Sequence, residues 1–345
     1  MFDLLDQYRV NELHVRDDAA TGLKAFIAIH NTRFGPALGG CRFIPYDSSD
    51  NALLDAVRLA RGMSYKAVLA GVPQGGGKAV IMKPPGSFDG EALFRSFGRF
   101  VQDLGGRYIT AVDAGTSARE MDWICKETQH VTSTSTEDNP AVYTARGVFE
   151  GIGAAIRHQL GQDHLQGLKV AVQGIGNVGY RLCEMLHQAG AELIISDINE
   201  QQTRRAAAAF GAKVVAPEAI YAVPCDAFAP CGLGGILNEQ TLPQLNCRVV
   251  AGSANNQLAS AQQGRWLHEQ GILYAPDYVI NAGGLVYASL HHLGKAHTLI
   301  EEKTKRIAHT LTEIFRQSAQ KDLATSAIAD ALAEKRLYQT LSEAA

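Results

Sequence analysis

Lys169-Val-Ala-Val-Gln-Gly-Ile-Gly-Asn-Val-Gly179 decides the fold, because an apolar strand pattern runs directly into a glycine-rich turn. A lone G-x-G-x-x-G is weak evidence, but here a helical pattern follows at 178–189 and a second strand pattern at 193–196 ends at Asp197. This order of elements is that of a dinucleotide-binding β-α-β unit. A turn that only packs a helix on a sheet is the less favoured alternative.

Each part of this turn has a predicted role. Gly174 permits the tight turn, Gly176 lets a pyrophosphate approach backbone N–H groups, and Gly179 lets the helix lie close to the strand. Asp197 would accept hydrogen bonds from ribose hydroxyls and repel a 2′-phosphate, which favours NAD over NADP. Arg204 and Arg205 leave that choice open. The predicted cofactor-binding residues of this segment are Gly174, Ile175, Gly176, Asn177, Val178, Gly179 and Asp197.

Apolar runs continue to alternate with helical and turn segments beyond this unit, which is typical of a doubly wound parallel sheet. Upstream, the polar stretch 132–140 has no periodicity and suits a linker. The runs that we interpret as further strands of the second domain are 212–215, 225–230, 249–251 and 273–275.

The sequence therefore predicts an α/β protein of two domains separated by a catalytic cleft. Residues 1–134 form an α/β domain for substrate and oligomerisation, and 135–285 form a Rossmann-type doubly wound NAD-binding domain. The helices of 286–345 are expected to pack back on the first domain. In the first domain the pattern predicts strands at 23–29, 79–82 and 107–112, and helices at 55–63 and 91–104.

A second glycine tract, Gly75-Gly76-Gly77-Lys78, precedes the strand at 79–82. Three glycines before a lysine predict a crowded turn that delivers an ammonium into a cleft, because glycine alone passes close to a bound group and adopts positive φ freely. A phosphate-binding loop is the rival interpretation. Its spacing is wrong, since Val72 stands where the first glycine belongs and Ala79 follows the lysine.

Composition excludes several functional classes. The 345 residues carry a net charge of −3 without a long run of Lys or Arg, so neither nucleic acid nor an anionic membrane surface is an expected partner. No run approaches the ~20 apolar residues of a spanning helix, and no leader pattern opens the chain, so we expect a cytoplasmic protein. The six cysteines include no C-x-x-C pair and His291-His292 lacks a neighbouring ligand, so no metal is expected.

Several segments together resemble the glutamate/leucine/phenylalanine/valine dehydrogenase family, most closely its leucine dehydrogenase branch. They follow the family's order through about residues 20–290, which is more specific than any single motif. The matching segments are 35–42, 62–66, 75–78, 105–110, the turn at Asp113, 174–179, 254–257 and 275–284.

The resemblance implies reversible oxidative deamination of an L-amino acid to its 2-oxo acid and ammonium, with NAD reduced. Lys78, made basic by burial and a neighbouring ammonium, would deprotonate the attacking water, and Asp113 would shuttle the proton of the amine. Lys66 would bind the substrate α-carboxylate, and Gly39 and Gly40 would leave room for the substrate backbone. A homo-oligomer is also implied.

The resemblance further places Thr144, Asn255 and Asn281 near the nicotinamide and its ribose. Asn255 and Asn281 could instead be turn residues, and Asp113 could instead cap a helix that begins near Thr116. The remaining expected substrate-binding residues are Leu38, Met63, Leu285 and Ala288.

Substrate choice is less strongly indicated. Glutamate enzymes of the family place a lysine where this chain has Leu38, so the pocket should be apolar and favour leucine, valine or isoleucine. Ala288 could open space for a phenyl ring while Leu285 takes some back, which keeps phenylalanine as an alternative. A catalytically silent NAD-binding sensor is the non-enzymatic alternative, and a sensor would have no need of the two lysines and the aspartate.

Overall fold

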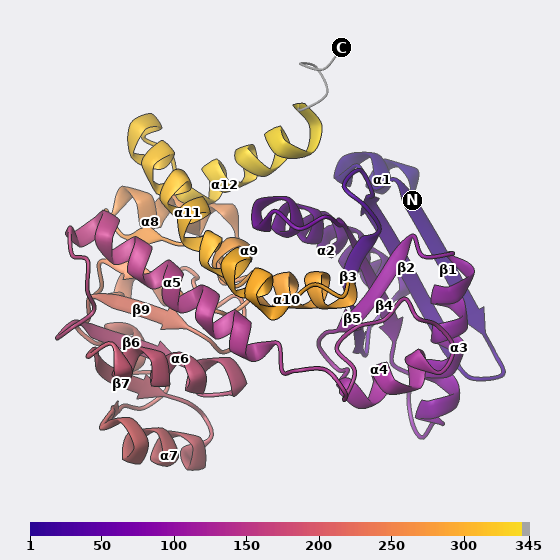
Figure 1. The fold of residues 1–345 in the computed structure, drawn as a ribbon, viewed down its shortest axis with the longest axis horizontal. Coiled ribbons are helices and arrows are strands. Elements are labelled where there is room, and N and C mark those ends of the chain that lie inside the picture. Colours follow the sequence, from indigo (N-terminus) through magenta and orange to yellow (C-terminus); the bar gives the residue numbers. More distant parts are fainter. Residues whose placement is uncertain (340–345) are drawn as a thin grey trace. The chain divides into compact units, whose positions relative to one another are not determined.

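The computed structural model describes residues 1–339, which divide into two compact units (Figure 1). Unit 1 comprises Met1–Asn139 and Ala288–Ala296, and unit 2 comprises Pro140–Tyr287 and the described chain from His297. The predicted two-domain α/β fold is confirmed. The chain divides after Asn139, a few residues beyond the expected boundary at 134, because α5 begins only at Ala141.

Unit 1 is built on a five-stranded sheet in the order β1-β2-β4-β3-β5. β2 pairs antiparallel with both β1 and β4, whereas β3 lies parallel between β4 and β5. Its elements are α1 (Phe2–Tyr8), β1 (Glu12–Asp18), β2 (Leu23–Asn31), β3 (Ala37–Ile44), α2 (Ser49–Ala70), β4 (Gly75–Met82), α3 (Gly90–Asp103), β5 (Tyr108–Val112) and α4 (Ala118–Cys125).

Side-chain alternation along β2 separates the two faces of this sheet. Ile27 and Ile29 enter the core that also contains the apolar residues of α3 and α4, while Ala28 joins the core of α1 and α2. On β4, Ala79 belongs to the first core and Val80 to the second. Lys78 therefore lies on the α2 face, two residues before Val80.

The predicted turn at 75–78 is wrong, because all four residues belong to β4. None of its three glycines has a positive φ. Crowding explains them instead: a Cβ on Gly75 would lie 1.7 Å from the Asn31 carbonyl oxygen, and one on Gly76 would lie 2.0 Å from the Ser64 nitrogen of α2. β3 was not predicted at all, since Gly39-Gly40 interrupts its apolar pattern.

Unit 2 contains a six-stranded, wholly parallel sheet in the order β11-β10-β9-β6-β7-β8. All six strands coincide with predicted ones, and the order is that of the doubly wound dinucleotide-binding fold. Its elements are α5 (Ala141–Leu160), β6 (Lys169–Gln173), α6 (Asn177–Gln188), β7 (Glu192–Ser196), α7 (Glu200–Phe210), β8 (Lys213–Val214), η1 (Ile220–Ala222), β9 (Ala227–Pro230), η2 (Leu242–Gln244), β10 (Val249–Val250), α8 (Ala261–Glu269), β11 (Leu273–Tyr274), α9 (Asp277–Ile280), α11 (His297–Lys321), α12 (Thr325–Glu334) and the π-helix Lys335–Gln339. α10 (Gly283–His292) belongs to unit 2 as far as Tyr287 and to unit 1 from Ala288.

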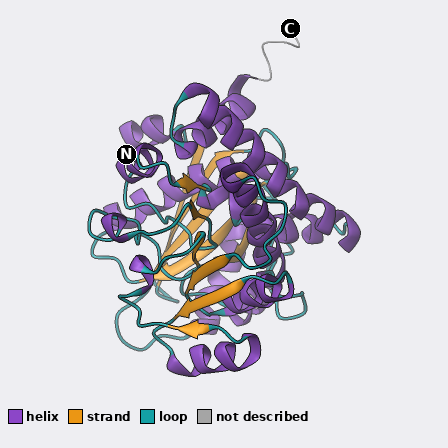
Figure 2. Ribbon diagram, turned by 90° about the vertical axis from the view of Figure 1, so that its left-hand side faces the viewer, coloured by secondary structure: helices purple, strands orange, loops and turns teal. Residues whose placement is uncertain are grey.

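Helices cover both faces of this sheet (Figure 2). Phe228 of β9 and Val250 of β10 pack in one core with Leu242 of η2 and Leu267 of α8, while α5 and α6 contact the opposite face. Within residues 1–339, no helix has both the length and the apolarity that crossing a bilayer requires.

α11 and α12, which the sequence analysis expected to pack on the first domain, belong to unit 2. α11 packs along α5, where a Cβ on Gly151 would lie 2.8 Å from Leu311. Thr325 at the start of α12 donates a hydrogen bond of 2.6 Å to the Tyr274 carbonyl of β11. These contacts bury the apolar stripe of α11 and cover the edge strand of the parallel sheet. Residues 340–345 lie outside the described chain.

We expect Gly76→Ala to lower the free energy of unfolding by about 2–3 kcal/mol, because the added methyl meets the backbone of α2. Gly62 is the matched control, since it lies in the same helix α2 and a Cβ there meets nothing within 4 Å. Gly62→Ala should raise stability by about 0.5–1 kcal/mol. Urea unfolding of both variants checks the pair, and equal effects would contradict the packing argument.

Candidate active site

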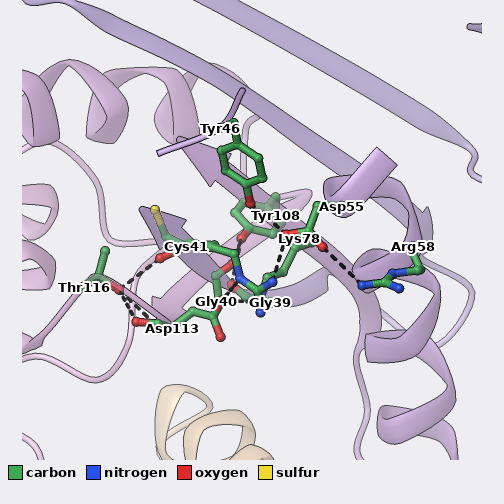
Figure 3. A network of polar contacts seen from close by, with 11 residues as sticks. Gly39, Gly40, Cys41, Tyr46, Asp55, Arg58, Lys78, Tyr108, Asp113 and Thr116 are labelled. Atoms are coloured by element: carbon green, nitrogen blue, oxygen red, sulfur yellow. Dashed lines mark hydrogen bonds and ion pairs between the residues drawn. The ribbon is translucent and has the colours of Figure 1, made fainter. Parts of the chain in front are cut away.

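A buried ion pair lies on the α2 face of the sheet in unit 1 (Figure 3). Lys78 of β4 is only 4% exposed, and its Nζ lies 2.7 Å from Oδ2 of Asp113, which directly follows β5. β3 runs between these two strands, so the carboxylate reaches across it. The structure thus brings together the two residues that the sequence analysis expected to act on protons.

Arg42 of β3 contacts the same carboxylate, with its Nε 2.9 Å from Asp113 Oδ2. Its Nη1 lies 2.8 Å from Oδ2 of Asp55 on α2, and the Tyr46 hydroxyl donates a 2.7 Å hydrogen bond to that oxygen. Sequence reasoning missed this network. A charged residue within the otherwise buried strand Ala37–Ile44 was the available signal.

The charged groups of this network shift one another's pKa values. Burial lowers the pKa of Lys78, Asp113 raises it and Arg42 lowers it, and the net pKa is below the ordinary value for a lysine. Burial alone would raise the pKa of Asp113, but Lys78 and Arg42 together hold it below its usual range. Asp113 therefore stays anionic, while Lys78 releases its proton more readily than an exposed lysine. The contribution of Arg42 was not predicted.

Glycines make room for this carboxylate. A Cβ on Gly40 would lie 2.7 Å from that of Asp113, and one on Gly39 would lie 1.8 Å from the Gly77 carbonyl oxygen. Close packing within the sheet thus requires both glycines, a reason additional to the expected room for substrate.

The alternative that Asp113 caps a helix is excluded. Ser117 is the N-cap of α4, and its N–H donates to Glu120 in a capping box. Asp113 instead donates its own backbone N–H to the Thr116 hydroxyl, at 2.9 Å. That contact fixes the backbone at the start of the turn and leaves the side chain for the ion pair.

The other expected substrate residues lie in several elements. Leu38 of β3 is 1% exposed, and Met63 and Lys66 lie half-buried on α2. Leu285 and Ala288 lie on α10 and are both buried, Leu285 within unit 2 and Ala288 within unit 1.

The glycine turn of unit 2 has the predicted local geometry. Gly174 has a φ of +92°, and a Cβ on Gly179 would lie 1.9 Å from the Gly174 carbonyl oxygen. Gly176 is the N-cap of α6 and faces open space, with nothing within 4 Å of a Cβ built there. Asp197 accepts hydrogen bonds from the backbone N–H groups of Ile175 at 2.5 Å and Asn199 at 2.8 Å. This carboxylate therefore also holds the turn together.

Loops after neighbouring strands adjoin this turn. Gly174 packs against Gly232, which follows β9, and Gly234 packs against the carbonyl of Asn255, which follows β10. Asn281 donates a 2.7 Å hydrogen bond to the Asn255 side chain. These loops all lie at the carboxyl edge of the sheet, where doubly wound folds bind ligands.

The residues present at this edge suit a dinucleotide. Gly176 leaves space at the first turn of α6, whose backbone N–H groups favour an anion. Within residues 1–339, Oδ1 of the buried Asn281 has no hydrogen-bond partner, so it could accept from a bound amide. Thr144, on the first turn of α5, packs against Gly284 near Asn281. Over the same described range, no group of three or more potential metal ligands occurs.

Comparison with known proteins accounts for both units. Residues 7–130 match the Glu/Leu/Phe/Val dehydrogenase dimerisation domain, and residues 138–200 and 195–335 match the Glutamate/Leucine/Phenylalanine/Valine dehydrogenase domain. The chain belongs to this dehydrogenase family. It is an amino-acid dehydrogenase, an oxidoreductase of a nicotinamide-dependent kind.

Relatives of this dehydrogenase differ in the substrate that their names give. A leucine dehydrogenase of Geobacillus stearothermophilus is 48% identical, covering 98% of this chain and 93% of its own. A phenylalanine dehydrogenase of Bacillus thermotolerans is 41% identical, covering 93% and 86%. The crystal structure of L-tryptophan dehydrogenase from Nostoc punctiforme covers 100% of both chains at 40% identity, with a TM-score of 0.89. The resemblance and fold predicted from the sequence are thereby confirmed.

We expect Asp113→Asn to lower the free energy of unfolding of this dehydrogenase by about 3 kcal/mol at neutral pH, because Lys78 and Arg42 lose their shared anion. Since the pKa of Asp113 is lowered in the folded state, its stabilisation is complete above about pH 4 and declines as the pH falls towards the folded-state pKa. The gap between wild type and variant should therefore narrow below pH 4 in urea unfolding.

Asp103 provides the control for this measurement. Its side chain is 59% exposed and pairs with Arg16 at the surface, so Asp103→Asn should change stability by less than about 1 kcal/mol. A gap for Asp113→Asn that stays constant below pH 4 would contradict the lowered pKa.

Proposed function

We propose that the protein catalyses the NAD-dependent reversible oxidative deamination of leucine, valine or isoleucine to the 2-oxo acid and ammonium. The observation that carries this proposal is the 2.7 Å ion pair between the buried Lys78 and the partly buried Asp113 in unit 1. A buried base beside a partly buried carboxylate suits a reaction that takes a proton from water and moves one to and from an amine.

In the proposed reaction, loss of hydride from the α-carbon leaves a substrate iminium that water must attack. The neutral amine of Lys78 takes a proton from that water, and burial supports this role because it lowers the lysine pKa. Asp113 exchanges a proton with the substrate nitrogen, so that ammonia leaves as ammonium. The carboxylate and the amine lie within hydrogen-bond distance of each other, so a proton can pass between them.

Lys66 binds the substrate α-carboxylate in this proposal. It lies on α2, one turn beyond Met63, on the helix that packs against β4 through Ser64 and Gly76. Its ammonium would attract the carboxylate as a compact point charge. Gly39 and Gly40 would leave room for the substrate backbone.

The glycine turn and the residues near it hold the dinucleotide in this proposal. A bound nicotinamide would supply the hydride acceptor for deamination and the hydride donor for the reverse reaction. Gly174, Gly176 and Gly179 with the start of α6 would hold the pyrophosphate, together with the intervening Ile175, Asn177 and Val178, while Thr144, Asn255 and Asn281 would contact the nicotinamide and its ribose.

The charged residues that follow the second strand of the β-α-β unit support NAD over NADP. Asp197 would bind the adenosine ribose and repel a 2′-phosphate. Arg204 pairs with Glu200 at 3.1 Å, and the guanidinium of Arg205 lies 4.3 Å from the centre of the Tyr180 ring. Both cations are thus engaged elsewhere.

An apolar substrate side chain is favoured by the buried Leu38, because an apolar wall offers no partner to a γ-carboxylate. The second candidate substrate is phenylalanine or a broader range of aromatic amino acids. The small side chain of Ala288 favours it, as do the relatives that are named for phenylalanine and tryptophan. We also propose a homo-oligomer, since residues 7–130 match a dimerisation domain.

The test measures kcat/KM for leucine, valine, isoleucine, phenylalanine and tryptophan, each with NAD and with NADP, by formation of reduced cofactor at 340 nm. We expect the branched-chain substrates with NAD to give the highest values. Discrimination should be modest, because one or two methylenes change the transition-state energy by only about 1–3 kcal/mol. A phenylalanine or tryptophan preference above tenfold would establish the aromatic alternative, and absence of all turnover would contradict the proposed reaction.

We expect Lys78→Met to lower kcat for deamination by about 10³-fold or more, because it removes the base but keeps an apolar chain in the buried site. The dissociation constant for NAD, measured by calorimetry, should stay within about twofold. Lys24→Met is the control: that side chain is 61% exposed on β2, so its removal should leave kcat unchanged. Loss of NAD binding along with kcat would contradict the separate roles of Lys78 and the glycine turn.

A further inference from the structure

We propose that Arg42, anchored by Asp55 and Tyr46, is a positioning residue that fixes the Asp113 carboxylate so that one oxygen is held and the other faces the substrate amine. This inference rests on the proposed function and names the part of that site that orients the proton shuttle. Nothing in the sequence motifs assigns Arg42 such a role.

The hydrogen bonds of Asp113 divide its two carboxylate oxygens. Oδ2 accepts from both Lys78 Nζ at 2.7 Å and Arg42 Nε at 2.9 Å, so two cations on adjacent strands contact the same atom. Among residues 1–339, no donor contacts Oδ1. An oxygen held by two cations is a poor proton acceptor, so proton exchange with the substrate nitrogen is assigned to Oδ1.

Asp55 in turn fixes the position of Arg42. Its Nη1 donates to Asp55 Oδ2 at 2.8 Å, and the Tyr46 hydroxyl donates to the same oxygen at 2.7 Å. The side chains of Arg42 and Asp55 are 19% and 14% exposed, so water competes little for these contacts. The guanidinium thus has one edge on the carboxylate after β5 and another on α2, which leaves it little freedom to turn.

The planarity of the guanidinium matters for this role. Nε and Nη1 point in fixed directions, so a contact with Asp55 sets the direction in which Nε meets Asp113. A lysine would keep the charge but could not make both contacts in a fixed geometry. Substitution of Arg42 can therefore separate the effect of its fixed geometry from the effect of its charge.

The charge of Arg42 has an effect of its own. Arg42 lowers the pKa of Lys78 and that of Asp113, while its own pKa is raised by the two aspartates despite burial. Removing the guanidinium should let the pKa of Lys78 rise. The acidic limb of the pH profile for deamination, which reports the free amine, should then move to higher pH.

The experiment compares Arg42→Gln, Arg42→Lys and Arg58→Gln in the full-length enzyme. Arg58 is the matched control, because it contacts the same Asp55 at 3.6 Å but is 60% exposed and does not reach Asp113. For each variant, kcat and KM for leucine are measured between pH 7 and 11, together with the dissociation constant for NAD and the thermal midpoint.

Arg42→Gln should lower kcat by about 10²-fold with KM for leucine changed less than about threefold, and should move the acidic limb upward by about one pH unit. Arg42→Lys should leave the limb near its wild-type position yet lower kcat by about tenfold, because the charge remains and the fixed geometry is lost. Arg58→Gln should resemble wild type in both readouts, and NAD binding should persist in all three variants.

Two results would overturn the inference. One is an Arg42→Gln enzyme that matches Arg58→Gln in kcat and in the position of the limb. The other is full recovery of kcat in Arg42→Lys, which would reduce the role of Arg42 to its charge. If the wild-type enzyme turns over no amino acid at all, the proposed function itself fails, and that outcome is distinct from both.

Discussion

Burial of the Lys78 ammonium is the constraint on which the rest of unit 1 depends. An isolated charge in a protein core is very costly, and this lysine lies in the middle of a sheet with an apolar core on either face. It is tolerated because Asp113 reaches it from the next strand but one. That reach requires glycine at position 40, because a Cβ there would collide with the side chain of Asp113. The charges and the glycine therefore form one arrangement.

In unit 2 the corresponding features are backbone groups of the glycine turn. Its glycine turn leaves the start of α6 open at Gly176, while Gly174 and Gly179 pack tightly around it. Asp197 closes the turn by accepting backbone N–H groups from Ile175 and Asn199. In the proposed function, unit 1 supplies side-chain charges for the proton transfers, and unit 2 supplies backbone donors suited to an anionic cofactor. In the proposed reaction, both are needed for one hydride transfer.

The sequence predicted unit 2 better than unit 1, and the reason is physical. The strands of unit 2 are short apolar runs buried on both faces, such as Lys169–Gln173, and each is followed by a recognisable turn or helix. In unit 1, Ala37–Ile44 carries two glycines and an arginine, so its pattern hides a central strand. The glycines before Lys78 indicated crowding correctly. The crowding comes from α2 at Gly76 and from neighbouring strands at Gly75 and Gly77, and not from a turn.

Other features lay outside the reach of local pattern. Arg42, Asp55 and Tyr46 come together only through the packing of β3 against α2, and neither charge periodicity nor spacing reveals that contact. The same holds for α11 and α12, whose amphipathic pattern predicts a buried stripe without naming the surface that buries it. Lys78 and Asp113 were found as a pair only because the resemblance to a family placed them together.

Packing around the glycines also bears on how the enzyme can diversify. At positions 39, 40, 75, 76 and 77 an added methyl would meet backbone or buried side chains, so packing requires glycine at each of them. A substitution there would cost stability before it could alter the choice of substrate. New substrate preferences would therefore have to arise at side-chain positions of the proposed substrate site, such as Leu38 and Met63. A backbone that tolerates no side chains here, with variable residues beside it, is compatible with relatives named for leucine, phenylalanine and tryptophan.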